Sequence, residues 1–284
     1  MNAKINFAKW HGIGNDFVII SGSGKERYDF QELARQMCDR HFGIGADGLI
    51  IISPSPAADF KMSIFNSDGS EADMCGNGTR CVAVYLNKNK MTEKTLITLE
   101  TLAGIIKPEL TLSDGAIALV KVDMGEPRLT RGEMSLGGDS SEQVVNSPLY
   151  IEGKTHLITC VSMGNPHCVI FTDDVSGVPL SEWGPLIENH PMFPYKTNVE
   201  FVQALDANTL RMRVWERGAG ITYACGTGAC AALVAGVLNG YTDREAVVKL
   251  DGGDLQVKWR GDNRVLMSGA AREVFRGVYF FNKN

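Results

Sequence analysis

The apolar positions of this chain fall into short runs of two kinds. Alternating or continuous runs rich in β-branched and aromatic residues indicate strands, which we place at 5–9, 17–20, 49–52, 60–65, 168–171, 199–203 and 210–215. Runs of small and apolar residues instead predict helices at 79–86 and 229–238. Strands interleaved with helices place the chain in the α/β (α+β) class.

The predicted helix at 229–238 is small or apolar on every side and stops at Asn239-Gly240, a common helix end. A helix without a polar face is buried. We therefore expect each half of the chain to be a curved, barrel-like sheet around a central helix. Further helices are expected at 30–40 and 181–189, and hairpins at 95–107 and 245–259.

The two central helices follow the same kind of turn, and the turns lie 150 residues apart. The first reads MCGNG at 74–78 and the second reads ACGTG at 224–228. The same offset relates Gly14-Asn15 to Gly164-Asn165, Gly48 to Asn198, and Asn66 to Glu216. One constant offset at several separate places indicates an internal duplication with two units.

The duplication predicts two pseudo-symmetric domains, 1–122 and 123–271. The boundary is placed where Met124-Gly125-Glu126-Pro127 interrupts the strand pattern. The last strand-like run, Val274 to Phe281, has no counterpart in the repeat. We therefore expect 272–284 to return to the first domain.

Bulk composition narrows the function classes. The chain has 284 residues, 44% hydrophobic and 21% charged, which is typical of a globular protein and not of a disordered one. A formal net charge of -5 without a block of basic residues argues against nucleic-acid binding. No apolar run is long enough to span a membrane, so we expect a cytoplasmic protein without membrane contacts.

Seven cysteines are present, an odd number in a chain too long for a small disulfide scaffold. Two of them, Cys75 and Cys225, begin the repeated turns. At such a place a thiol meets the positive end of a helix, which lowers its pKa and favours the thiolate. The glycines that follow leave main-chain N–H groups open to an anion.

Two similar thiols, one in each half, suit the inversion of a carbon centre. One thiolate removes a proton from one face, and the other thiol supplies a proton to the opposite face. Most cysteines without such a context are small buried hydrophobic residues. We expect this structural role for Cys38, Cys81, Cys160, Cys168 and Cys230. Zinc binding is disfavoured because the Cys75/Cys81 and Cys225/Cys230 spacings are too long and lie within helices. We expect neither a metal nor a cofactor.

Several motifs together identify a family that the chain resembles. They are HGIGNDF at 11–17, NSDGSEADMCGNGTRC at 66–81, GNPH at 164–167, TNVE at 197–200, ERG at 216–218 and ACGTGACA at 224–231. In these the chain resembles the diaminopimelate epimerases, cofactor-independent epimerases of lysine and peptidoglycan precursor synthesis. The resemblance runs nearly end to end. It implies two similar α/β domains and a homodimer that acts on a small amino-acid substrate.

The resemblance also implies residue roles. Cys75 and Cys225 are the expected acid–base pair, and His167 with Glu216 is expected to tune their protonation. The substrate-binding residues implied are Asn15, Asn66, Gly76, Asn77, Asn165, Asn198, Glu216, Arg217, Gly226 and Thr227. An arginine can grip a carboxylate with two hydrogen bonds, and a glutamate can accept from an ammonium group. The chain departs from some relatives at Gly48, where they carry a glutamine that reaches the substrate.

Two alternatives remain open at this point. The first is a racemase of another amino acid, such as histidine or a proline derivative, on the same fold. Proline racemase-like chains typically carry histidine where Asn77 stands. The second is a thiol-bearing binding or redox-sensing protein without turnover, which would show no exchange of substrate protons with solvent.

Overall fold

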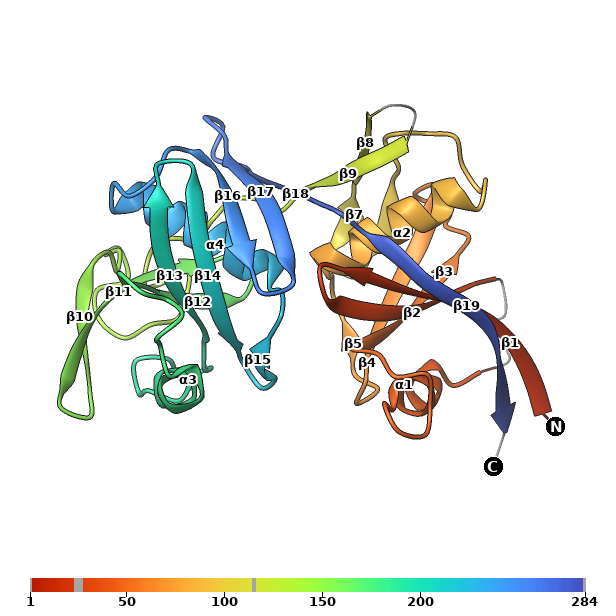
Figure 1. Ribbon diagram of the computed structural model, residues 1–284, viewed down its shortest axis with the longest axis horizontal. Helices are drawn as coiled ribbons and strands as arrows, with labels where there is room; N and C mark the ends of the chain where they lie inside the picture. Colours follow the sequence, from red (N-terminus) through yellow and green to blue (C-terminus); the bar gives the residue numbers. More distant parts are fainter. Residues whose placement is uncertain (1, 23–27, 114–115, 283–284) are drawn as a thin grey trace. The chain divides into compact units, whose positions relative to one another are not determined.

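The computed structural model describes residues 2–22, 28–113 and 116–282. The chain divides into two compact units, which are described separately. Unit 1 comprises Met1–Val122 with Gly269–Asn284, and unit 2 comprises Asp123–Ser268. Each unit combines a mixed sheet with one central helix and one outer helix (Figure 1). This is the two-domain α/β architecture expected from the duplicated pattern.

The sheet of unit 1 has the order β19-β1-β2-β3-β4-β6-β7, with β5 paired to β4. Its strands are β1 (Asn2–Gly12), β2 (Asn15–Ser21), β3 (Gly48–Ser53), β4 (Phe60–Asn66), β5 (Glu71–Ala72), β6 (Leu99–Thr101), β7 (Gly104–Ile106) and β19 (Arg272–Asn282). The hairpin of β8 (Glu109–Ser113) and β9 (Ala116–Asp123) follows. Strand β19 runs antiparallel beside β1, so the C-terminal segment completes the sheet in which the chain begins (Figure 1).

In unit 2 the sheet has the order β10-β11-β12-β13-β14-β16-β17-β18, with β15 paired to β14. Its strands are β10 (Ser147–Ile151), β11 (Lys154–Ser162), β12 (Pro166–Phe171), β13 (Asn198–Asp206), β14 (Thr209–Glu216), β15 (Gly220–Thr222), β16 (Glu245–Leu250), β17 (Gly253–Trp259) and β18 (Val265–Gly269). Strands β12 and β13 are parallel, whereas β13 and β14 are antiparallel.

The central helices are α2 (Gly76–Lys88) in unit 1 and α4 (Gly226–Leu238) in unit 2. Helix α4 contacts β11, β12, β13, β14, β16 and β17, and its residues 228–236 are all buried. Because strands surround helix α4, its sequence has no polar face. Both helices begin three residues earlier than predicted, because the glycine-containing turns are themselves the first helical turns.

The outer helices are α1 (Phe30–Cys38) and α3 (Leu180–Glu188). Helix α1 packs on β3 and β4, and its buried residues Leu33 and Met37 belong to the core of unit 1. Helix α3 packs on β13, β14 and β15. Among the residues that the structure describes, no helix is both long and apolar enough to cross a membrane.

The internal duplication extends to strand register. In unit 1, Phe17 lies opposite Gly48 in the parallel pair β2–β3, and in unit 2 His167 lies opposite Asn198 in β12–β13. The 150-residue offset relates Phe17 to His167 and Gly48 to Asn198. Positions that the offset relates in the sequence are therefore also structurally equivalent in the two sheets.

Candidate active site

In unit 1, three polar or glycine positions share one edge of the sheet. Strand β2 begins at Asn15, β3 begins at Gly48 and β4 ends at Asn66. Because β2 and β3 are parallel and β4 is antiparallel to them, these three ends lie at the same edge. Asn66 is exposed there and donates from Nδ2 to the Ser70 hydroxyl at 2.9 Å.

Cys75 lies immediately before α2 and caps its N-terminus. Its backbone is extended (φ -140°, ψ 115°), and its sulfur accepts the backbone N–H of Gly78 at 3.5 Å. The same sulfur lies 3.7 Å from Oδ1 of Asn15, to which the thiol donates. A cysteine thus replaces the serine or aspartate that usually caps a helix. The thiol stands where the helix dipole favours negative charge.

The amide of Asn15 is held by contacts on both sides. Its Oδ1 accepts from Nδ2 of Asn77 at 3.1 Å, and its own Nδ2 donates to Asp47 at 2.7 Å. Asn77 itself is buried, with 4% of its surface exposed. The structure therefore brings Cys75, Asn15 and Asn77 into direct contact, as a substrate-binding group beside an acid–base group requires.

An ion-pair network supports this edge of unit 1. Asp16 pairs with Lys9 at 2.6 Å and with Arg40 at 2.9 Å, and Arg40 also reaches Asp47 at 2.7 Å. Burial by itself would raise the pKa of Asp16, but the hydrogen bonds from Arg40 and Lys9 outweigh it and lower the pKa to about 2. Sequence reasoning did not single out these residues, because they come from three separate elements.

The matching edge of unit 2 carries Asn165, Asn198 and Glu216. Asn165 directly precedes β12, β13 begins at Asn198, and β14 ends at Glu216. Asn198 is buried; its Nδ2 donates to the Pro166 carbonyl at 2.8 Å, and its Oδ1 accepts the backbone N–H of Arg217 at 3.0 Å. The amide of Asn198 therefore fixes the backbone that carries Arg217.

Cys225 caps α4 as Cys75 caps α2. Its sulfur accepts the N–H of Gly228 at 3.3 Å and lies 3.6 Å from the hydroxyl of Thr227. The expected lowering of its pKa is wrong for this structure. Burial, followed by the charges of Glu216 and Glu200, raises the pKa of Cys225 well above its ordinary value despite the helix end. Here Cys225 is a thiol, suited to donate a proton.

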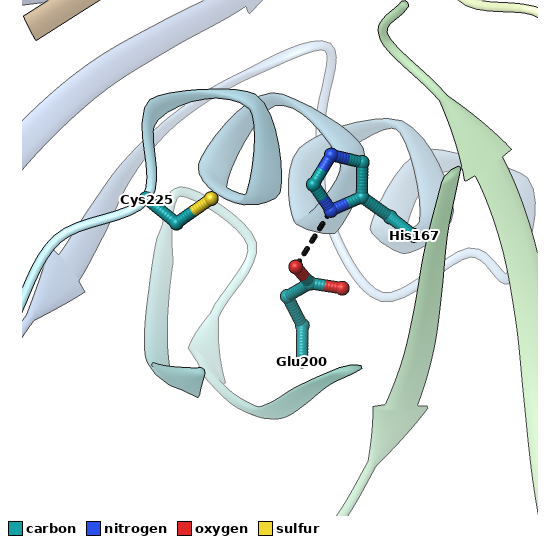
Figure 2. A group of neighbouring side chains, drawn as sticks. All are labelled: His167, Glu200 and Cys225. Atoms are coloured by element: carbon teal, nitrogen blue, oxygen red, sulfur yellow. Dashed lines mark hydrogen bonds and ion pairs between the residues drawn. The ribbon is translucent and has the colours of Figure 1, made fainter. Parts of the chain in front are cut away.

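A buried histidine–glutamate pair lies beside Cys225. Nδ1 of His167 is 2.7 Å from Oε1 of Glu200, and Nε2 of His167 is 3.0 Å from Oδ1 of Asn165. Neither side chain of the His167–Glu200 pair has any exposed surface. Figure 2 shows His167 and Glu200 directed toward each other, with the Cys225 sulfur nearby.

Glu200 is a residue that sequence reasoning missed. It belongs to the TNVE motif at 197–200, yet only Asn198 of that motif was given a role. The available signal was a charged residue within the apolar run VEFV at 199–202, since an acidic side chain is rarely buried without a partner.

Glu216 and Arg217 lie at the end of β14 with different exposures. Burial raises the pKa of Glu216, although hydrogen bonds from Thr222 and Cys225 oppose the rise. Arg217 is exposed, and its guanidinium donates to the Tyr195 carbonyl at 3.0 Å. The Glu216 carboxyl group is thus held close to the Cys225 thiol, whereas the Arg217 guanidinium lies at the surface.

Ligand-type atoms of His167, Glu200 and Cys225 all lie within 4.8 Å of one another. Such a set resembles a metal site in residue type. Here, however, both ring nitrogens of His167 are engaged in hydrogen bonds, and the sulfur caps a helix. The arrangement is a buried hydrogen-bonded network, and we assign no metal to it.

The chain was compared with known proteins by family and by structure. The profile of the diaminopimelate epimerase family matches residues 7–130 and 159–274. The diaminopimelate epimerase of Pelotomaculum thermopropionicum is 56% identical over 97% of this chain and 99% of its own length. That of Moorella thermoacetica is 54% identical over 97% and 99%, and that of Methanococcus maripaludis 50% over 96% and 99%.

Solved structures of low sequence identity share the fold. A phenazine biosynthesis protein of the PhzF family from Bacillus anthracis superposes with a TM-score of 0.74 at 16% identity, covering 98% of this chain and all of its own (100%). A hydroxyproline epimerase from Agrobacterium vitis superposes with a TM-score of 0.72 at 16% identity, covering 99% and 93%.

The relatives are epimerases, and the duplicated α/β fold carries a helix-capping cysteine in each unit, so the class of protein is an isomerase that inverts a carbon centre. Within that class, the extent and level of sequence identity decide the family. The chain belongs to the diaminopimelate epimerase family.

Proposed function

We propose that the chain converts L,L-2,6-diaminopimelate to meso-diaminopimelate in lysine and peptidoglycan precursor synthesis. Cys75 and Cys225 are the acid–base pair, one as thiolate base and the other as thiol acid. The observation that carries this proposal is that each cysteine caps a buried central helix at pseudo-equivalent positions of the duplicated fold. Membership of the diaminopimelate epimerase family supplies the substrate.

The chemistry has two requirements at the reacting carbon. The α-proton is weakly acidic, so its removal needs a placed base and stabilisation of the carboxylate as it gains enolate charge. The first N–H groups of a helix have no partner within the helix and bind anions well. In this chain those groups belong to Gly76 and Asn77 in unit 1 and to Gly226 and Thr227 in unit 2.

The remaining polar groups suit the distal end of the substrate, which carries an ammonium and a carboxylate. Arg217 provides the cation for the carboxylate, and Glu216 provides an acceptor for the ammonium group. Four asparagines add hydrogen bonds without net charge, namely Asn15, Asn66, Asn165 and Asn198. Their amides lie at the two matching sheet edges; that of Asn66 is exposed, and that of Asn198 is buried.

At Gly48 the chain offers only its backbone. A Cβ at this position would lie 2.9 Å from the Phe65 carbonyl oxygen, which is part of the paired strand β4. A larger residue therefore requires a shift of β3 against β4. This explains in packing terms why the glutamine found in some relatives is not simply interchangeable with glycine here.

We further propose that the protein acts in the cytoplasm as a homodimer, without nucleic-acid or membrane partners. Strand β19 supports self-association, because Val274, Val278 and Phe280 on it are exposed apolar residues. They lie on the edge strand of the unit 1 sheet. An uncovered apolar edge strand favours pairing with another chain.

The proposed reaction is tested by following optical purity and the α-protons of L,L-diaminopimelate incubated with the reduced protein. Meso product is expected for the wild type. Cys75→Ala and Cys225→Ala are each expected to lower the rate by about 10²–10⁴-fold, because each removes one partner of the proton transfer. The matched control is Cys38→Ala, a core thiol on α1, which should retain activity.

Two results would overturn the proposal. One is turnover of L-histidine or L-proline in preference to diaminopimelate, which would favour a different amino-acid racemase. The other is wild-type turnover by either single cysteine variant, which would rule out the two-thiol mechanism.

A further inference from the structure

The two units differ beside their otherwise equivalent cysteines. At the place related by the duplication to Glu200, unit 1 has Ile50, and at the place related to His167 it has Phe17. A Cβ on Gly78 would lie 3.0 Å from the Ile50 Cδ1 methyl group, and a Cβ on Gly228 would lie 2.7 Å from Glu200 Oε1. The same space under the first turn of the helix is thus filled by a methyl group in one unit and a carboxylate in the other.

Packing alone does not explain a carboxylate at this place, because unit 1 fills it with apolar atoms. The Glu200 side chain is fully buried, and among the described residues its Oε2 has no hydrogen-bond partner. A buried carboxylate oxygen without a hydrogen-bond partner destabilises a fold. Such a cost at a position beside a reactive group points to a role in function.

Contacts of Glu200 connect the thiol to a substrate-binding amide. Its Oε1 is 2.7 Å from Nδ1 of His167, whose Nε2 is in turn 3.0 Å from Asn165. A carboxylate accepts hydrogen bonds, so it fixes the ring orientation and places the proton of His167 on Nδ1. The carboxylate also lies close to Gly228, where an added Cβ would be 2.7 Å from Oε1, and Figure 2 shows it near the sulfur of Cys225.

We propose that Glu200 is a positioning residue for the unit 2 half of the epimerisation. It orients His167, and through it Asn165, and it places its carboxyl group beside the sulfur of Cys225. Unit 1 has no counterpart of the His167–Glu200 pair, so the surroundings of the two thiols differ. Cys75 contacts the amide of Asn15, whereas Cys225 lies beside the buried His167–Glu200 pair. The inference rests on the proposed function.

Other groups that face this thiol are included in the expectation. Glu216 from β14 and His167 from β12 lie beside Cys225, and Cys168 from β12 lies near enough to Glu200 to interact with its charge. Glu216 carries a second carboxylate beside the thiol. Removing the charge of Glu200 alone should therefore change the reactivity of Cys225 without making it equal to Cys75.

The test is Glu200→Gln, which keeps the volume and one acceptor and removes the charge. Alkylation of each cysteine by iodoacetamide is followed across pH by peptide mass spectrometry. A charge at this range alters a neighbour's acidity by about one unit or more, so Cys225 should alkylate about tenfold faster at pH 8. Cys75, in the same molecule, should keep its wild-type rate.

The kinetic expectation is a fall in kcat of about 10–100-fold, because His167 and Asn165 lose their fixed orientation, with KM within about threefold. Glu200→Asp, which restores the charge, should return the Cys225 alkylation profile toward the wild type. The double variant H167F/E200I copies the pair found in unit 1; it should keep the wild-type Tm within a few degrees and lose activity.

Some outcomes overturn the proposal. They are unchanged alkylation of Cys225 in Glu200→Gln, an equal change at Cys75 and Cys225, or wild-type kcat in Glu200→Gln or in H167F/E200I. The alkylation measurement needs no substrate. If the wild type failed to epimerise diaminopimelate, the proposed function would fail while the effect of Glu200 on Cys225 could still be observed.

Discussion

The two cysteines occupy equivalent places but meet different neighbours. Cys75 donates to the amide of Asn15, whereas Cys225 lies among the carboxylates of Glu216 and Glu200. A helix N-terminus favours the thiolate at both, but at Cys225 burial and the two negative charges outweigh it. Inversion needs one base and one acid at any moment, so the unlike neighbours of the two thiols bear on which one takes each role.

Asp16 carries a residue-scale prediction. Its pKa is about 2, below that of an unfolded aspartate, so its stabilising effect is complete above about pH 4 and is lost as pH falls through about 2. Asp16→Asn removes the carboxylate that pairs with the buried Lys9 and should lower the free energy of unfolding by about 2–3 kcal/mol at pH 7. Urea denaturation measures this.

The matched control is Glu32→Gln, which breaks an exposed ion pair with Arg35 on α1. It should leave the urea midpoint unchanged, because exposed pairs contribute little. Equal midpoint shifts in the two variants would contradict the view that the Asp16 network holds the edge of unit 1.

At the scale of elements, the first turns of α2 and α4 place the chemistry. Each turn carries its N–H groups and its capping sulfur at a sheet edge where strands also present asparagines. The glycine at the third position of each turn is needed because a neighbouring strand approaches it closely. The strand side chain that approaches is Ile50 in one unit and Glu200 in the other.

This difference predicts unequal effects of two matched substitutions. Gly228→Ala pushes against Glu200 Oε1 and the Cys225 sulfur, at 2.7 and 3.1 Å, and should lower kcat about tenfold. Gly78→Ala meets the Ile50 methyl group at 3.0 Å and should cost less than threefold. Steady-state kinetics on both variants decides. A larger loss in Gly78→Ala would contradict the account.

Much of the element pattern was predictable from the sequence, and the reasons are local. The expected helices at 229–238 and 181–189 overlap α4 and α3, because apolar periodicity and stop signals are short-range properties. The hairpin turn expected at Gly104 is also present, with a positive φ of 104° that favours glycine.

What escaped prediction depends on long-range contacts. Glu200 on β13 meets His167 on β12 and Gly228 on α4 only when the sheet closes on the helix. The pKa of Cys225 was expected to fall because its own turn favours a thiolate; burial, followed by the carboxylates on β14 and β13, raises it instead. Local sequence cannot reveal such charges.

For the whole molecule, the C-terminal strand offers a prediction about assembly. Val278→Glu with Phe280→Glu places charges on the exposed apolar face of β19 and should convert a dimer to a monomer. Sedimentation velocity at micromolar concentration measures the change. Exposed Leu157 on β11 is the control, and Leu157→Glu should leave the dimer intact. A monomeric wild type would contradict the proposed homodimer.

The duplicated fold as a whole places one thiol in each unit. We propose that these two thiols act on the two faces of one carbon. The most direct measurement is conversion of L,L-diaminopimelate in deuterated water, with product and remaining substrate analysed at early time. We expect the meso product to carry solvent deuterium at the inverted carbon while the unreacted substrate keeps its original α-proton. Equal labelling of both from the start would indicate a single base that exchanges with solvent, and would contradict the two-thiol mechanism.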